Sequence, residues 1–216
     1  MKMILKYVAA IVLGYLLGSI LFSYDLPKLL RHTDITLNSD DKNPGAANAF
    51  KNAGIPIGIL CLICDMFKGF APVFVASRYI DVNSLMFSLV MLAPVLGHAT
   101  APFHKTIGGK AIAVSFGVLL GVFPSSKAVI ALAFWYILFA AVFRIRPNSK
   151  CSIITYTMFS FTMLCGTFFI GDLQYTVGCL LISAVVIYRH AVSGMDKNAL
   201  REEGFEDSDE DVKVSV

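Results

Sequence analysis

Residues 55–79 read IPIGILCLICDMFKGFAPVFVASRY, and most of the side chains in this run are apolar. A helix of about 20 apolar residues crosses the hydrocarbon core of a membrane, so the run is long enough to span one. Asp65 and Lys68 lie near its middle, where a charge is costly in lipid. Their i, i+3 spacing lets the two side chains meet on one helix face. We therefore predict an ion pair that faces the protein interior.

The rest of the chain has the same apolar character. Of its 216 residues, 56% are hydrophobic and 15% are charged, whereas a soluble domain carries about 25% charged residues. This composition excludes a water-soluble globular protein. The apolar residues form seven runs, at about 3–23, 55–79, 84–97, 111–123, 127–143, 151–170 and 174–189. We predict an all-α, polytopic membrane protein with about seven transmembrane helices, some of them short or broken.

The runs at 84–97 and 111–123 are short for a hydrocarbon core about 30 Å thick, because a helix rises about 1.5 Å per residue. Interrupted helices survive at membrane depth only where protein or a water-filled cavity satisfies their backbone groups. We therefore expect this pair of runs to line an active cavity.

The distribution of basic residues predicts the orientation in the membrane. With seven spans, the loops at 24–54, 98–110 and 144–150 share one side with the carboxyl-terminal end, and that side holds 13 of the 18 Lys and Arg residues. Such an excess favours the cytoplasm. We predict an amino terminus outside the cell and a cytoplasmic carboxyl terminus. Residues 1–200 form the predicted membrane domain, and residues 201–216 a disordered acidic tail.

Two polar stretches on the predicted cytoplasmic side could bind an anion. The first, DKNPGAANAFK at 41–51, has an Asn-Pro-Gly turn, after which Asn48 and Lys51 share a helix face. The second has Gly97-His98 and then Gly108-Gly109-Lys110 at a helix start, where backbone N–H groups and a lysine can approach an anion. Taken alone, they also fit an ordinary loop with a helix start and a flexible turn at the membrane edge.

A third stretch, Tyr188-Arg189-His190, ends the last apolar run on the same side. Arg and His at a helix end also serve as interfacial anchors, so this stretch has a purely structural interpretation too. All three stretches lie on one side, as a single site requires. We interpret His32 and His104 as solvated loop residues.

In order and spacing, the three stretches and the element Asp65-x-x-Lys68-Gly69-x-x-Pro72 resemble the bacterial acyl-phosphate:glycerol-3-phosphate acyltransferases of the PlsY type. The resemblance covers about residues 11–200 and begins with GYLLGSI at 14–20. It implies a seven-helix enzyme of the bacterial inner membrane with a cytoplasmic-side site. Such enzymes transfer a fatty acyl group from acyl phosphate to the sn-1 hydroxyl of glycerol 3-phosphate, giving lysophosphatidic acid and phosphate. The implied partners are these substrates and membrane lipid, with no metal, cofactor or nucleic acid.

The resemblance also implies roles for individual residues. The catalytic residues are His190, Lys110 and His98; the substrate-binding residues are Asn43, Gly45, Asn48, Lys51, Gly108, Gly109, Arg189 and Ser193; Asp65 and Lys68 support the site. The glycines and Lys110 suit the leaving phosphate, and Lys51 suits the glycerol phosphate. The proton of the attacking hydroxyl goes to His190, to His98 or to a phosphate oxygen, and the sequence does not choose among them.

Four residues depart from the pattern of the family in ways that bear on activity. Asp41 stands for Ser, Lys51 for Arg, Ile107 for Lys and Ser193 for Asn. Lys51 keeps the charge of arginine without its bidentate geometry, and Asp41 adds a negative charge near an anionic substrate. Two alternatives therefore stay open: a divergent paralogue that is inactive or uses another acyl acceptor, and a small transporter in which Asp65 and Lys68 line the pathway.

Overall fold

A computed structural model describes residues 2–37, 39, 41–104, 108–170 and 172–202. Ile107 and nearly all of the acidic tail lie outside these residues. Every regular element in the described part of the chain is helical. The elements are α1 (Lys2–Gly18), α2 (Phe22–Arg31), α3 (Ala46–Ala53), α4 (Ile55–Tyr79), α5 (Phe87–Thr100), α6 (Ile112–Gly121), α7 (Ala128–Tyr136), the π-helix η1 (Ile137–Val142), α8 (Asn148–Ile170) and α9 (Leu173–Glu202). The predicted all-α class is confirmed.

Each of the seven apolar runs corresponds to a helix or, for residues 127–143, to α7 continued by η1. The segments Lys2–Arg31, Ile55–Tyr79 and Leu173–Ser193 are long and apolar enough to cross a membrane, and α5 and α6 are short apolar helices. The number of spans stays a prediction. Residues 24–54, predicted as a loop with one helix start, contain most of α2 and all of α3.

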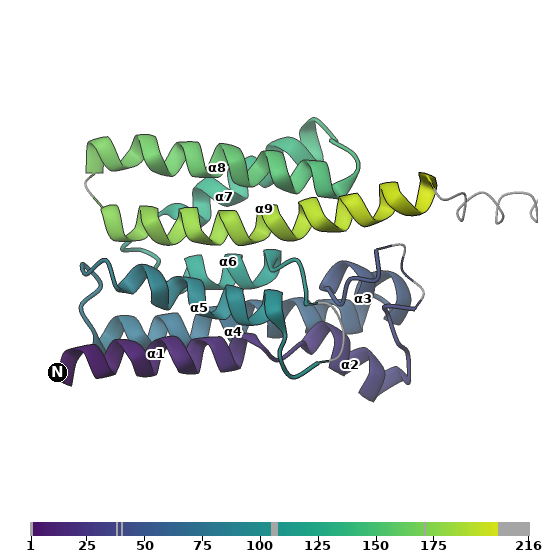
Figure 1. Cartoon of the computed structure of the whole chain (residues 1–216), viewed down its shortest axis with the longest axis horizontal. Helices are drawn as coiled ribbons and strands as arrows, with labels where there is room; N and C mark the ends of the chain where they lie inside the picture. Colours follow the sequence, from purple (N-terminus) through teal and green to yellow (C-terminus); the bar gives the residue numbers. More distant parts are fainter. Residues whose placement is uncertain (1, 38, 40, 105–107, 171, 203–216) are drawn as a thin grey trace, which may run out of the picture.

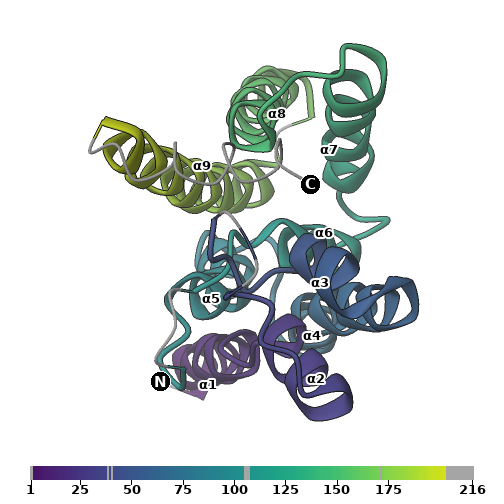
Figure 2. The ribbon, with the colours of Figure 1, turned by 90° about the vertical axis from the view of Figure 1, so that its right-hand side faces the viewer.

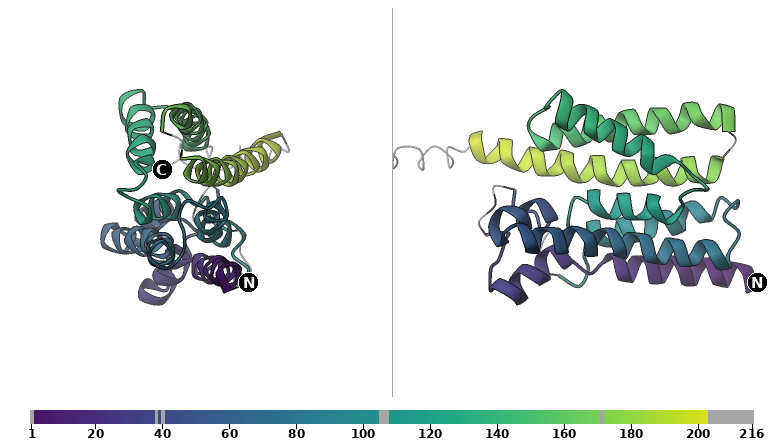
Figure 3. Two further views of the ribbon diagram at one scale, coloured as in Figure 1. Left: turned by 90° about the vertical axis from the view of Figure 1, so that its left-hand side faces the viewer. Right: turned by 180° about the vertical axis from the view of Figure 1, so that it is seen from behind.

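The helices form two layers that lie against each other. Figures 1 and 3 show α7, α8 and α9 on one side and α1 to α6 on the other. The layers meet mainly where α5 packs on α9 and where α6 leads into α7. Figure 1 places α2, α3 and the carboxyl-terminal end of α9 at one end of the molecule and the start of α1 at the other. Figure 2 looks onto the end that carries α2 and α3.

The close packing of α4 on α6 positions the polar end of the molecule. A Cβ atom at Gly117 would collide with the carbonyl of Met66, and one at Gly69 with the carbonyl of Val114. Small residues at these two positions let the helix backbones approach closely. The contact places the start of α6, with Lys110 just before it, beside the middle of α4.

The outer helices α1 and α4 expose large apolar side chains, whereas the inner helix α5 is mostly buried. Large apolar side chains are exposed on α1, as at Leu5 and Leu13, and on α4, as at Ile63 and Phe67. In α5, by contrast, 10 of the 14 residues are buried, including Phe87 and Met91. Exposed apolar side chains on long helices are what a lipid environment accommodates.

Candidate active site

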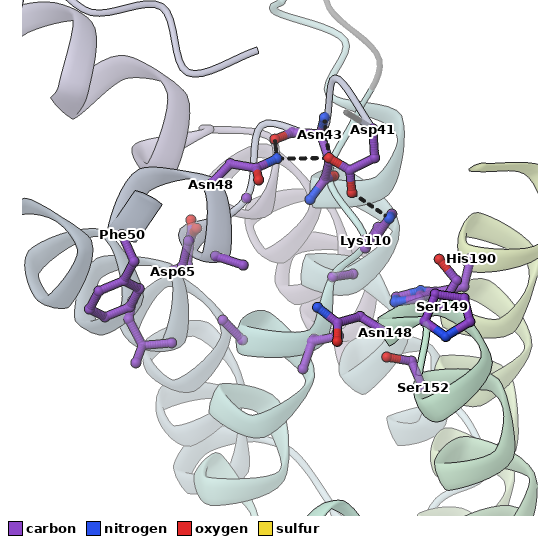
Figure 4. Close-up of a pocket in the computed structure, with 18 of the residues that line it drawn as sticks. Asp41, Asn43, Asn48, Phe50, Asp65, Lys110, Asn148, Ser149, Ser152 and His190 are labelled. Carbon is purple, nitrogen blue, oxygen red and sulfur yellow. Dashed lines mark hydrogen bonds and ion pairs between the residues drawn. The ribbon is translucent and has the colours of Figure 1, made fainter. Parts of the chain in front are cut away.

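A cavity of about 1110 Å³ lies among α3, α4, α5, α6, α8 and α9. It brings together residues from all three polar stretches and from α4, namely Asn43, Gly45, Asn48, Lys51, Asp65, His98, Lys110 and His190. Figure 4 labels Asn43, Asn48, Asp65, Lys110 and His190 among them. Four predicted substrate-binding residues do not line it, namely Gly108, Gly109, Arg189 and Ser193. The run at 111–123 lines the cavity as expected, through residues such as Ile112 and Phe116 of α6. No residue of the run at 84–97 lines it, and α5 contributes only His98, which follows that run.

Asp41 connects the first stretch to the second (Figure 4). Its Oδ2 atom lies 2.7 Å from Lys110 Nζ in an ion pair, and its Oδ1 atom accepts a hydrogen bond of 2.8 Å from Asn48 Nδ2. Burial alone would raise the pKa of this carboxyl group. The hydrogen bonds and charge of Lys110, with the hydrogen bond from Asn48, outweigh burial and hold the pKa below its usual value. Asp41 is therefore ionised at neutral pH and offsets the charge of Lys110.

Helix α3 presents Asn48 and Lys51 to the cavity, as their spacing predicts. Gly45 is the residue before the helix and has an extended backbone. The opposite face of α3 carries Ala49 and Ala53, which join a buried cluster with Ile57 of α4. Asn48 is buried, whereas Lys51 is exposed and reaches the cavity from its edge.

The predicted ion pair of α4 is present and almost completely buried. Asp65 Oδ1 lies 2.8 Å from Lys68 Nζ, and each side chain is only 2% exposed. Ser23 of α2 donates a hydrogen bond to Asp65 Oδ2, and Lys68 donates to the carbonyl of Ile20. Lys68 Nζ also lies 2.8 Å from His98 Nδ1. The ammonium group therefore has one ion-pair partner, Asp65, and two hydrogen-bond partners, the Ile20 carbonyl and His98.

These contacts fix the tautomer and the role of His98. Because Lys68 is the donor, Nδ1 of His98 accepts and Nε2 carries the proton. A Cβ atom at Gly109 would collide with Nε2, and the N–H of Gly109 donates to the His98 carbonyl at 3.1 Å. His98 thus packs against the glycine turn, and the N–H of Gly109 already has a protein partner.

Arg189 holds the same turn from α9. Its guanidinium donates to the carbonyls of Gly108 and Gly109, the latter at 3.3 Å. The two glycines therefore present their carbonyls to Arg189. In this structure Arg189 positions the turn that carries Lys110, which differs from the expected direct contact with substrate.

His190 is the histidine whose second nitrogen is available to a substrate. The side chain is 2% exposed, lines the cavity, and donates from Nδ1 to the carbonyl of Val186 at 3.2 Å. Since a carbonyl only accepts, Nδ1 carries the proton in the neutral ring and Nε2 has the free lone pair. Nε2 forms no hydrogen bond with any described residue.

Two features of this region were not predicted. The interpretation of His104 as a solvated loop residue is wrong, because its Nε2 atom lies 3.1 Å from Asp25 Oδ1 and its side chain is 13% exposed. The second feature is a wall of the cavity formed at the start of α8 by Arg146, Asn148, Ser149, Lys150 and Ser152. The sequence signal for this wall is the polar segment RPNSK at 146–150, which lies between two apolar runs.

The exposed apolar faces and the polar cavity at one end of the bundle define an integral membrane protein with a polar site. Residues 8–194 match the family model of glycerol-3-phosphate acyltransferase, so the chain belongs to that family. A glycerol-3-phosphate acyltransferase of Hydrogenobaculum sp. (strain Y04AAS1) is 35% identical over 181 residues, which cover 83% of this chain and 87% of the relative. The Aquifex aeolicus (strain VF5) enzyme is 33% identical over 188 residues, covering 86% and 92%.

Two crystal structures of PlsY, an integral membrane glycerol 3-phosphate acyltransferase, share the fold. The glycerol 3-phosphate form has a TM-score of 0.75 and 26% identity, and covers 93% of this chain and 94% of that one. The lysophosphatidic acid form has a TM-score of 0.69 and 27% identity, with 93% of each chain covered.

Proposed function

We propose that this chain transfers a fatty acyl group from acyl phosphate to the sn-1 hydroxyl of glycerol 3-phosphate, giving lysophosphatidic acid and inorganic phosphate. Membership of the glycerol-3-phosphate acyltransferase family supports the acyl acceptor and the reaction. The observation that carries the proposal is the cavity itself. Four cationic side chains line it, and so do apolar residues of α6 and α8 such as Phe116 and Ile153. A site of this composition suits two phosphorylated substrates, one of which has an acyl chain.

The reaction needs positioning more than covalent catalysis. Acyl phosphate is a mixed anhydride with a good leaving group, so the main task is to hold two anions together and direct the hydroxyl at the carbonyl carbon. A bond forms between the hydroxyl oxygen and this carbon, and the bond from the carbon to the phosphate oxygen breaks. Inorganic phosphate leaves.

His190 is our choice for the group that accepts the proton of the attacking hydroxyl. His190 lines the cavity and its Nε2 has no partner among the described residues, whereas both ring nitrogens of His98 are taken up by Lys68 and by packing against Gly109. His190 is thus the proposed general base, and His98 a residue that positions the glycine turn. The proton then passes to the departing phosphate.

The ion pair of Asp41 and Lys110 favours one variation of this function. A carboxylate near Lys110 repels a phosphate dianion and accepts hydrogen bonds from hydroxyl groups, so an acyl acceptor richer in hydroxyls than glycerol 3-phosphate is the second candidate. A panel of polyol phosphates as competing acceptors distinguishes the two.

The proposal is tested with the purified full-length protein in lipid nanodiscs, palmitoyl phosphate and glycerol 3-phosphate. We expect lysophosphatidic acid and inorganic phosphate to form in equal amounts, and palmitoyl coenzyme A to be a poor donor. Absence of product from palmitoyl phosphate with every acceptor of the panel, in protein that keeps its helical circular dichroism, would refute acyl transfer.

The proposed orientation has the amino terminus outside the cell and the carboxyl terminus in the cytoplasm, in the bacterial inner membrane. The excess of basic residues on the loops at the cavity end supports it. A phosphatase reporter fused after Val216 should be inactive if this end is cytoplasmic, and an active fusion would reverse the orientation.

A further inference from the structure

The cationic side chains that line the cavity differ in whether an ion pair already neutralises them. Lys51, Lys110, Arg146 and Lys150 line the cavity. Lys110 is paired with Asp41 at 2.7 Å, whereas the other three have no ion-pair partner within the described part of the chain. A reaction between two phosphorylated substrates requires positive charge at two places. Lys51 on α3 supplies positive charge at one of these places, and the positive charge at the second must come from another wall of the cavity.

The start of α8 provides such a wall. Arg146 Nη1 donates to Asn148 Oδ1 at 2.8 Å, which holds the guanidinium against the first residue of the helix. The N–H of Cys151 bonds to the carbonyl of Pro147 at 3.2 Å, so the N–H groups that precede it lie in the unpaired first turn. The helix terminus adds partial positive charge to that of Arg146 and Lys150.

Two buried polar side chains also present free hydrogen-bonding atoms to this wall. His190 is 2% exposed, and the lone pair of its Nε2 has no partner among the described residues, so it can accept the proton of a substrate hydroxyl beside this wall. Ser152 is 3% exposed and accepts a hydrogen bond of 3.0 Å from Tyr136, which leaves its own hydroxyl proton to donate. Figure 4 shows both on the same side of the cavity as Asn148 and Ser149, across from Asn48 and Asp65.

We propose that Lys150, together with Arg146 and the first turn of α8, binds the phosphate group of the acyl donor. Lys150 supplies the positive charge that Lys110 does not offer, because Asp41 neutralises Lys110 in an ion pair. The inference rests on the proposed function, because it takes two phosphorylated substrates as given. The donor is assigned to this wall because Ile153 follows on α8 and lines the cavity. The acyl chain can then extend along an apolar surface directly from its phosphate.

The first test compares Lys150→Ala with Arg144→Ala in steady-state kinetics of both substrates. Arg144 is an exposed cation of the same loop that does not line the cavity, so it is a matched control. Lys150→Ala should raise KM for palmitoyl phosphate about tenfold, the scale of one charge-assisted hydrogen bond. KM for glycerol 3-phosphate should stay within about twofold, as should both constants of Arg144→Ala. An unchanged donor KM, or a rise confined to glycerol 3-phosphate, would overturn the proposal.

The second test asks whether Lys110 can take over from Lys150 as the cation that binds the donor phosphate. In an Asp41→Ser background Lys110 is released from its ion pair and is free to bind phosphate. Loss of Lys150 should then raise the donor KM by no more than about threefold, because the two lysines substitute for each other. An effect of Lys150→Ala that is equally large with Asp41 and with Ser at that position would contradict this substitution.

Direct binding separates this inference from the proposed reaction. Inorganic phosphate binding to the wild-type protein in nanodiscs, measured by equilibrium dialysis, needs no turnover. Lys150→Ala should weaken it severalfold and Arg144→Ala should not. If the wild type shows no acyl transfer but Lys150 is still needed for phosphate, the anion site stands and the reaction is wrong. If phosphate binds equally well without Lys150, the site fails whatever the activity.

Discussion

The buried pair of Asp65 and Lys68 gives the sharpest test of how this fold is held together. In Lys68→Met, a side chain of similar length replaces the ammonium, and Asp65 stays buried at 2% exposure with Ser23 as its remaining side-chain partner. Removing one member of a buried ion pair costs about 3–5 kcal/mol, because the other charge is left uncompensated. At roughly 2–4 °C per kcal/mol for a chain of this size, the melting temperature should fall by about 6–20 °C.

The measurement is the thermal unfolding midpoint in one detergent, followed by tryptophan fluorescence and by circular dichroism. The exposed pair of Lys28 and Asp34 is the control, because its nitrogen–oxygen distance is 3.9 Å and the Lys28 side chain is 58% exposed. Lys28→Met should leave the midpoint unchanged, since exposed pairs contribute little.

A double variant shows whether the cost comes from the unpaired charge. Lys68→Met with Asp65→Asn removes both charges, so it should recover most of the stability that Lys68→Met loses. If Lys68→Met lowers the midpoint by less than about 2 °C, or if the double variant is no more stable than the single one, the argument from the buried charge is refuted.

Three further predictions concern the cavity. His190→Gln should lower kcat by about 10²–10⁴-fold without changing the melting temperature, as expected for loss of a general base; an unchanged kcat at saturating substrates would exclude that role. The pKa of Asp41 is lower in the folded protein than in the unfolded chain, so its stabilising effect is complete above the ordinary carboxyl pKa of about 3.9 and is lost as the pH falls through the folded-state value. The melting-temperature difference between wild type and Asp41→Asn should therefore shrink on acidification, and growth of that difference would contradict the assignment. Gly109→Ala should abolish acyl transfer, because its Cβ would collide with the His98 ring, whereas Gly166→Ala should be silent, since nothing lies within 4 Å of a Cβ at that position; equal activities of the two variants would show that the close contact does not matter.

Local patterns in the sequence were sufficient for much of the fold. The run at 55–79 forms α4 with the same bounds. In lipid, a single apolar segment of this length satisfies its backbone N–H and C=O groups by forming a helix. The Asp65–Lys68 pair was predictable for a similar reason. Its geometry depends on the spacing of two residues within one helix, which the sequence states directly.

Polar contacts between distant parts of the chain were not predictable in this way. Asp41 and Lys110 pair across 69 residues, and His104 and Asp25 across 79. The sequence indicated that the three polar stretches lie on one side of the membrane, but it gave no partner for any of their side chains. Partner choice depends on the distances and angles at which helices pack.

The sequence by itself therefore determined the membrane class, the helical runs, the ion pair within α4 and the polar segments from which the site is built. Tertiary structure alone decided that Arg189 holds the glycine turn, that Lys68 fixes His98, and that the start of α8 completes the cavity. The physical reason lies in helices such as α5 and α6, which are apolar on nearly every side and buried among their neighbours. A helix without a polar face carries no pattern that says which neighbour it meets, so its packing has to be seen in three dimensions.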